Sequence, residues 1–262
     1  MRFKVQLVRA SKEDIPINID YRRRFISLLK KIFEKEFHEK SPKPYTFTVY
    51  FGKHTNIEED HIKGVENINF RFSTGEPKTA ISFYNGILKL IKESYLHNMN
   101  TKLGNAQFKI DSVRVEKEYE PNGLFKTLSP VVVERAVYSK NPKERYATPM
   151  DKDFEWWLLE NSLKRYKALV REDLTVKTFK LKQVKAKNDI LLWEDLTVKT
   201  FKLEPIEIKE EFVKHYEGYV RGFLGKFKLH TDSKDLLRFV YQYGLGVRTG
   251  QGFGYLETLD KI

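Results

Sequence analysis

The 262-residue chain carries 48 lysines and arginines against 36 aspartates and glutamates, a formal net charge of +12, and 40 % of its residues are hydrophobic. This apolar fraction is enough for a core, and the basic excess favours a polyanionic partner, with an ordinary basic surface as the alternative. The absence of cysteine excludes disulfides, thiolate metal sites and a cysteine nucleophile, and the absence of any stretch of ~20 apolar residues predicts a cytoplasmic protein without a membrane segment.

Residues 1–120 alternate between strand and helix patterns. The predicted order is strand, helix, strand, strand, helix, strand, at residues 2–8, 20–38, 45–52, 67–73, 76–95 and 107–116. Asp20 is the predicted N-cap of the first helix, and the second helix is predicted to bury Ile81, Leu88 and Ile91. The outer face of the first helix is strongly cationic. This order of elements is that of the ferredoxin-like motif.

A break at Pro121 and Asn122-Gly123 precedes a second series of elements. The pattern predicts one or two strands at 124–138, a basic loop at 140–149, a helix at 151–170, strands at 205–213 and 216–229, a helix at 233–243 and a strand at 253–259. Without the middle insert, the order β-α-β-β-α-β occurs a second time. The predicted fold class is therefore α+β, with two tandem ferredoxin-like domains at residues 1–120 and 121–262.

The insert contains a duplication. Ten residues, EDLTVKTFKL, occur at 172–181 and again, unchanged, at 194–203. Divergent structural repeats keep patterns rather than identities, so this is a recent tandem duplication or an artefact of cloning. Only one copy can occupy a given strand, and we expect the other to lie in an extra hairpin or a mobile loop.

Glycines are concentrated near the end of the chain. Residues 243–255, YGLGVRTGQGFGY, hold five of the fourteen glycines around Arg248. Their predicted order of helix, loop and strand is the reverse of a mononucleotide site, and both the dinucleotide and the P-loop motifs are incomplete. Two interpretations stay open, a tight connection without a ligand and a loop whose backbone amides contact phosphates.

The six histidines give few local indications of chemistry. His38 ends the first helix, where it can simply interact with the helix dipole. His54 and His61 lie near acidic residues but without the spacing of a metal site, so no metal is expected there. Structural roles are expected for the isolated histidines, which are His97, His215 and His230.

Taken together, the glycine-rich segment, the tandem halves and the basic helix resemble the CRISPR-associated endoribonucleases that process precursor CRISPR RNA, the Cas-six family of the RAMP superfamily. The most specific match is GLGVRTGQGFG at 244–254, which is similar to the family's C-terminal glycine-rich loop. TLSPVVV at 127–133 is similar to the segment that opens the family's second domain. The N-terminal MRF is a weaker third match.

The resemblance implies RNA cleavage without metal or other cofactor, by attack of the 2′-hydroxyl on the adjacent phosphate. His38 occupies the place of the family's histidine and would act as base or acid. Lys43 would act electrostatically on the phosphate, and Tyr45 would orient the hydroxyl or share the proton transfer. Some members carry a tyrosine on the first helix, where this chain has Ile32 and Phe33, so that set is incomplete.

The implied partner is CRISPR repeat RNA, as precursor and as processed guide RNA. Candidate RNA contacts come from the first helix, the basic loop and the glycine segment, namely Arg22, Arg23, Lys140, Lys143, Arg145, Arg248, Thr249, Gly250, Gln251 and Gly252. For the basic residues a solvated cationic face is the alternative. A non-catalytic RNA-binding subunit of an effector complex and a metabolic enzyme on the same scaffold are the competing functions. Formation of a homodimer is left open.

Overall fold

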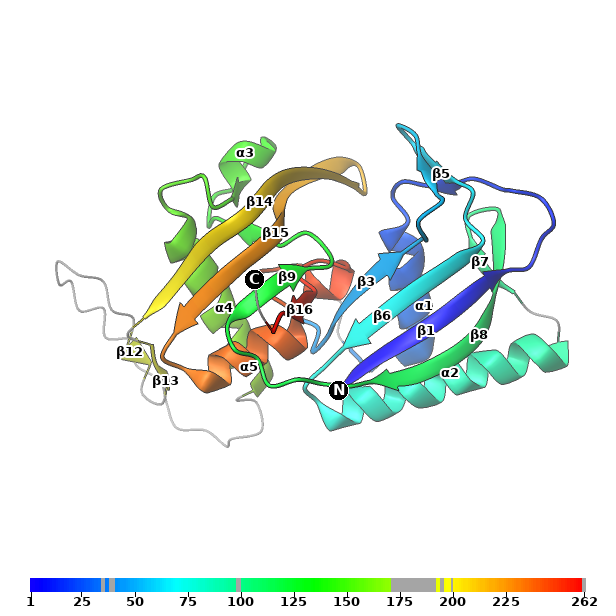
Figure 1. Ribbon diagram of the computed structural model, residues 1–262, viewed down its shortest axis with the longest axis horizontal. Helices are drawn as coiled ribbons and strands as arrows, with labels where there is room; N and C mark the ends of the chain where they lie inside the picture. The colour runs from blue at the N-terminus through cyan, green and yellow to red at the C-terminus, as the bar shows by residue number, and fades with distance from the viewer. Residues whose placement is uncertain are drawn as a thin grey trace.

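The computed structural model describes two antiparallel sheets, each with helices packed against it (Figure 1). The described residues are 1–33, 36–37, 41–97, 100–170, 192–193, 196–198 and 200–260. The fold is mixed α+β, as predicted. Within these residues, no helix is long and apolar enough to cross a membrane.

The first sheet has the strand order β3-β6-β1-β8-β7. Its strands are β1 (Arg2–Arg9), β3 (Thr46–Tyr50), β6 (Asn67–Ser73), β7 (Thr101–Leu103) and β8 (Ala106–Glu116), all paired antiparallel. In β1 the apolar side chains of Phe3, Val5 and Leu7 are buried, as the alternating sequence predicts. A small separate sheet, β2-β5-β4, contains Ile17–Asn18, His61–Lys63 and Asn56–Ile57. The pattern analysis missed this sheet because its strands have only two or three residues.

Two helices, α1 (Arg22–Phe33) and α2 (Pro77–His97), belong to this half. The prediction for the buried face of α2 was wrong at Ile81, which is 60 % exposed, and at Leu88, which is 42 % exposed, whereas Ile91 is partly buried against the core. The helix instead buries Phe83 and Ile87. Phe83 stacks on Phe72 of β6 with ring centroids 3.9 Å apart, and this contact fixes the rotation of a helix that carries apolar residues on two faces.

The second sheet has the order β14-β15-β9-β16. Its strands are β9 (Leu124–Thr127), β14 (Phe201–His215), β15 (Gly218–Thr231) and β16 (Leu256–Thr258), and the helices are α4 (Phe154–Val170) and α5 (Lys234–Tyr243). Ser233 caps α5 by accepting a hydrogen bond from Leu236 N, so this helix begins where the sequence predicts. Pro205 is tolerated because β14 is an edge strand with an irregular register at that point.

Short elements connect these strands. They are β10 (Val133–Glu134), α3 (Pro142–Arg145), β11 (Tyr146–Ala147), β12 (Leu192–Trp193), β13 (Leu196–Thr197) and the 3₁₀ turn η1 (Thr249–Gln251). The first copy of the duplicated decapeptide, at 172–181, lies outside the described residues. The second copy ends inside β14, where Leu203 pairs with Leu229 and is buried. That the first copy lies elsewhere stays a prediction.

Buried polar bonds join the two halves. The Arg2 guanidinium, at the start of β1, donates to the carbonyls of Tyr241 (2.9 Å) and Leu256 (2.6 Å). From β3, Thr46 Oγ1 donates to Phe253 O at 2.9 Å. The glycine-rich segment 243–255 therefore lies against the first sheet, which brings the end of the chain beside its beginning.

Candidate functional site

The glycine-rich segment forms a compact loop between α5 and β16, so the predicted order of helix, loop and strand is confirmed. Four of its glycines and Arg248 have positive φ angles. A Cβ atom at Gly246 would overlap Val132 O, and one at Gly254 would overlap Leu245 O. Glycine is required at both positions because of the backbone angle and because of the close approach of a carbonyl.

Arg165 of α4 holds this loop from inside. Its Nη1 donates to Gly244 O (2.8 Å) and Gly246 O (3.0 Å), and its Nη2 donates to Tyr243 O (2.9 Å) and Thr249 Oγ1 (2.9 Å). The guanidinium is fully buried, and burial lowers the pKa of Arg165 to about 10. A buried cation therefore satisfies backbone carbonyls that the irregular loop leaves unpaired.

Arg165 was not among the residues predicted from the sequence. Its position seven residues after Leu158, on the apolar side of the predicted helix, was an available indication, because a cation on that side must find acceptors. Thr249 extends the same set of bonds, since its hydroxyl donates to Tyr45 O at 3.0 Å.

Arg22 also contacts the loop. We predicted it on the outer face of the first helix, but Arg22 is only 7 % exposed. Its Nε donates to Gly252 O (3.3 Å), and its guanidinium lies 4.9 Å from the centre of the Phe253 ring. The first turn of α1 faces the second half of the chain, which explains the burial. Contact of Arg22 with RNA stays a prediction.

A cavity of about 640 Å³ lies between the two halves. One wall is apolar and includes Ile26, Leu29, Phe33 and Phe37. The rest of the lining is mainly polar and cationic. It contains predicted site residues from both ends of the chain, which are Lys43, Tyr45, Arg248, Thr249, Gly250 and Gln251. His38 lies outside the described residues, although Phe37 and Ser41, which precede and follow 38–40 in the sequence, both line the cavity.

Lys43 and Tyr45 lie against the glycine-rich loop. A Cβ atom at Gly250 would be 2.6 Å from Lys43 Cγ, so the lysine stem packs directly on the glycine. The Tyr45 ring stacks on Phe33 with centroids 5.3 Å apart and is 5 % exposed. Burial raises the pKa of Tyr45 far above its ordinary value, so its hydroxyl stays protonated and acts as a neutral hydrogen-bonding group.

Arg248 shares a carboxylate with Arg145. Arg248 Nη2 lies 3.6 Å from Glu134 Oε1, and Arg145 Nε lies 2.6 Å from the same oxygen. Arg248 Nη1 also donates to Gln251 Oε1 at 3.3 Å. The structure therefore brings these two predicted RNA contacts together, with their charges partly compensated by Glu134.

His215 reaches the loop from the end of β14. Its Nε2 lies 3.2 Å from Gln251 Oε1, and its Nδ1 lies 3.4 Å from Asp20 Oδ1. Burial lowers the pKa of His215, so a neutral ring is favoured. Helix α1 begins at Arg22, so Asp20 lies two residues before it. The Oδ2 atom of Asp20 accepts a hydrogen bond from Tyr216 N at 3.0 Å. This long-range contact explains why His215 looked isolated in the sequence.

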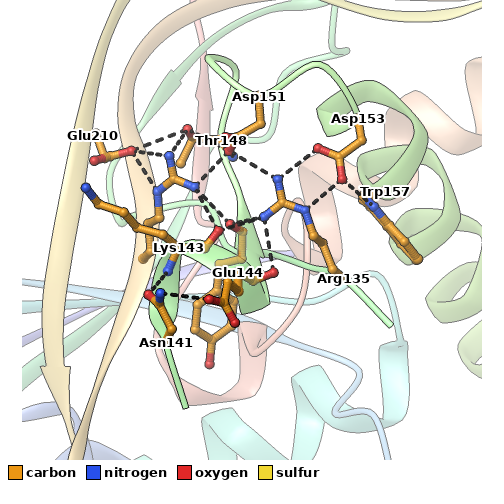
Figure 2. Close-up of polar contacts among 11 residues, drawn as sticks. Arg135, Asn141, Lys143, Glu144, Thr148, Asp151, Asp153, Trp157 and Glu210 are labelled. Atoms are coloured by element: carbon orange, nitrogen blue, oxygen red, sulfur yellow. Dashed lines mark hydrogen bonds and ion pairs between the residues drawn. The ribbon is translucent and has the colours of Figure 1, made fainter. Parts of the chain in front are cut away.

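The basic loop at 140–149 is held by two other arginines, and Figure 2 shows one of them, Arg135, among its polar partners. The loop contains α3, which we had not predicted. Arg135 Nη1 donates to Lys143 O (3.0 Å) and Tyr146 O (2.6 Å), and Arg221 Nη1 donates to Tyr146 O (3.0 Å). The side chains of Lys140 and Lys143 are exposed, and neither lines the cavity. The network fixes the backbone of the loop and leaves these two lysines facing solvent.

The carboxylates of this network have altered proton affinities. A hydrogen bond from Arg135 to Asp153, together with the nearby positive charge, lowers the pKa of Asp153 to about 2. Arg221 Nη1 lies 2.8 Å from Asp151 Oδ2, and the pKa of Asp151 is lowered by its bond with the Thr148 backbone and by Arg221, against the opposing effect of burial. Both groups are therefore charged at neutral pH.

Comparison with known proteins identifies relatives of this architecture. The family model for CRISPR associated protein Cas6, C-terminal, matches residues 113–258, which is more than half of the chain. A CRISPR-associated endoribonuclease-like protein, Cas6nc, of Pyrococcus horikoshii is 25 % identical over 177 residues. That match covers 66 % of this chain and 64 % of the relative, so the chain spans less than two thirds of the length of this curated relative.

Solved structures show the same fold. The product of a Cas6-related gene from Pyrococcus furiosus is 23 % identical, with a TM-score of 0.75 over 100 % of this chain and 99 % of that one. A RAMP protein that binds different RNA substrates is 20 % identical, with a TM-score of 0.74 over 99 % of this chain and 100 % of that one. The region that the family model matches contains the glycine-rich loop that Arg165 holds. Because that model matches more than half of the chain, the chain belongs to the CRISPR-associated Cas6 family.

Proposed function

We propose that this protein is an endoribonuclease that cleaves CRISPR repeat RNA within a precursor transcript and so produces guide RNAs. The observation that carries the proposal is the cavity in which Lys43 and Tyr45, which follow His38 closely in the sequence, face the glycine-rich loop. The RAMP relative that binds different RNA substrates supports RNA as the ligand. The net charge of +12 agrees with a polyanionic substrate.

In the proposed reaction the ribose 2′-oxygen forms a bond to the adjacent phosphorus and the bond from phosphorus to the 5′-oxygen breaks. His38 takes the proton of the 2′-hydroxyl or gives one to the leaving 5′-oxygen, since an imidazole with a pKa of ~6.5 can do either near neutral pH. The products are a 2′,3′-cyclic phosphate and a 5′-hydroxyl. His38 makes one of the two proton transfers and water makes the other, so the step balances without a metal ion.

Lys43 stabilises the negative charge that develops on the phosphorane. Its stem packs on Gly250, and its ammonium group therefore acts beside the backbone of the glycine-rich loop. Tyr45 orients the reacting group through a protonated hydroxyl, because the raised pKa of Tyr45 makes it a weak proton donor. Arg248 and the loop residues from Thr249 to Gly252 contact the RNA backbone.

A second candidate function is RNA binding without cleavage. Its support is the burial of Tyr45, which is 5 % exposed, together with the absence of a tyrosine at Ile32 and Phe33 of α1. A site with one histidine and a buried tyrosine has fewer groups for proton transfer than the family's full set. In that case the protein would hold guide RNA within an effector complex.

The proposal includes two ferredoxin-like domains, at residues 1–120 and 121–262. The four main strands of each half have equivalent orders, β3-β6-β1-β8 and β14-β15-β9-β16, and this supports a common arrangement. Two such domains would present the cavity between them to a single RNA. This domain division would explain why the cavity draws residues from distant parts of the chain.

The test is cleavage of a CRISPR repeat RNA in the presence of EDTA, with the ends of the products mapped. We expect a 2′,3′-cyclic phosphate, and we expect no cleavage when the scissile nucleotide carries a 2′-deoxyribose. His38→Ala should abolish cleavage but keep RNA binding. His54→Ala is the matched control, because His54 is exposed and does not line the cavity. Wild-type cleavage by the His38 variant would contradict the mechanism, and tight binding without product would favour the second candidate.

A further inference from the structure

The tip of the β14–β15 hairpin is fixed against the first half of the chain. The hairpin arches from the second sheet toward the first half (Figure 1). Lys214 Nζ lies 2.7 Å from Asp60 Oδ1, and Tyr216 N donates to Asp20 Oδ2 at 3.0 Å. With His215 packed between Asp20 and Gln251, the turn has a defined position beside the glycine-rich loop.

Tyr216 combines an unusual backbone with an exposed ring. Its φ angle of 55° lies in the left-handed region, where a bulky residue is uncommon, and its exposed fraction is 46 %. The ring edge packs on His215 with centroids 4.6 Å apart. The Arg23 guanidinium lies 4.8 Å from the centre of the Tyr216 ring, and the Arg23 side chain is 55 % exposed.

Anchoring of the hairpin does not explain this ring. The hydrogen bond and ion pairs that fix the turn are made by the backbone of Tyr216 and by the side chains of Lys214 and His215. The ring adds contacts with Arg23 and His215, and Tyr216 is still 46 % exposed. The exposed area of Tyr216 therefore remains available to a ligand.

The ring also lines the cavity, together with Arg248 and Gln251. Because Tyr216 is half-exposed, the part of the cavity that it lines is open to solvent. An aromatic ring and a guanidinium plane, placed beside a cationic surface, are the groups on which unpaired RNA bases stack. Other exposed tyrosines of the described chain, such as Tyr219 on the same hairpin, do not line the cavity.

We infer that Tyr216 and Arg23 form a stacking site for one unpaired RNA base at the opening of the cavity. The inference rests on the proposed function in so far as the ligand is RNA, but it does not require cleavage. The site positions the nucleotide next to the one whose phosphate contacts the glycine-rich loop. Because every base has an aromatic face, the site contributes affinity and position more than sequence discrimination.

The test compares RNA affinities of Tyr216→Asn, Tyr216→Phe and Tyr219→Asn with that of the wild type. Asparagine tolerates a left-handed backbone, so Tyr216→Asn removes the ring without adding strain. Tyr219 is the matched control, because it is 57 % exposed and lies on the same hairpin. The probe is fluorescently labelled oligoadenylate, and thermal unfolding measured by circular dichroism confirms that each variant is folded.

We expect Tyr216→Asn to weaken binding by about 5- to 100-fold, the effect of losing one stacked base. Tyr216→Phe should bind like the wild type, as should Tyr219→Asn. An oligonucleotide of the same length with abasic sugars should bind the wild type and Tyr216→Asn equally.

Two results would overturn the stacking site while leaving the proposed function intact. They are unchanged affinity of Tyr216→Asn, and an equal loss in Tyr219→Asn. If the wild type binds neither oligoadenylate nor CRISPR repeat RNA, the proposed function and the stacking site both fail. Cleavage assays are not needed for this comparison, so loss of catalysis alone does not affect its result.

Discussion

Replacing Arg165 with methionine removes the buried cation that holds the glycine-rich loop. The guanidinium makes four hydrogen bonds, to three backbone carbonyls and to the Thr249 hydroxyl. Methionine is unbranched, apolar and similar in volume, although shorter, so Arg165→Met leaves these acceptors without their donor but removes little side-chain volume. The loop would then have to rearrange or admit water to satisfy its carbonyls.

The size of the effect depends on two opposing contributions. Four hydrogen bonds from a charged donor, at about 1.5 kcal/mol each, would stabilise the fold by about 6 kcal/mol. Burial of the charge opposes this, and the lowered pKa of about 10 for Arg165 indicates a cost of about half that amount. We therefore expect Arg165→Met to lower the free energy of unfolding by about 3 kcal/mol, which is large for a single substitution.

Urea denaturation followed by tryptophan fluorescence measures this difference. Arg238→Met is the matched control, because Arg238 has a 54 % exposed side chain and pairs with Glu120 on the surface. We expect the control to change stability by no more than about 0.5 kcal/mol. If Arg165→Met were no less stable than Arg238→Met, the loop would not depend on the buried cation and the reasoning would be refuted.

Three further predictions concern charged groups. Glu134→Gln removes the carboxylate that Arg145 and Arg248 share, so RNA binding should become tighter and more dependent on salt, as measured by affinities over a series of ionic strengths. Asp153 has a pKa of about 2 in the folded protein, below its ordinary 3.8. Its stabilising effect is therefore complete above pH 3.8 and is lost as the pH falls to 2. In acid unfolding, the stability of Asp153→Asn should depend less on pH over that interval. Burial lowers the pKa of His215 below 6.5, so the unfolded state binds the proton more readily and stability should fall as the pH drops below 6.5; His215→Gln should reduce this fall in urea denaturation at several pH values.

Local sequence patterns predicted the strands of the two main sheets except the three-residue β7. The alternation in residues 67–73 matches the bounds of β6, and the strand predicted at 107–116 lies within β8. The face of α2 was predicted wrongly because that helix has apolar residues on two sides, and only the stacking of Phe83 on Phe72 decides between them. Such a choice depends on a contact between distant residues, and local periodicity carries no information about it.

The candidate site shows the same division between local and long-range information. The glycine concentration at 243–255 predicted an irregular loop, because glycine adopts positive φ angles without strain. The sequence could not show that Arg165 and His215 contact this loop, since they come from α4 and β14. Their partners in the loop are backbone carbonyls, a threonine hydroxyl and an amide side chain, which leave no recognisable spacing in the sequence.

The basic composition does not show which of the cations are exposed. A loop with inward-facing carbonyls needs buried donors, and this chain uses Arg165 and Arg22 for that purpose. These arginines count toward the net charge of +12 but lie away from solvent, so they cannot all be phosphate ligands. In the proposed function, the exposed cations, such as Lys140 and Arg23, would contribute to the electrostatic attraction of RNA, whereas the buried ones would give the loop the shape that RNA meets. Charge alone therefore indicates the class of partner, and burial decides which cations can touch it.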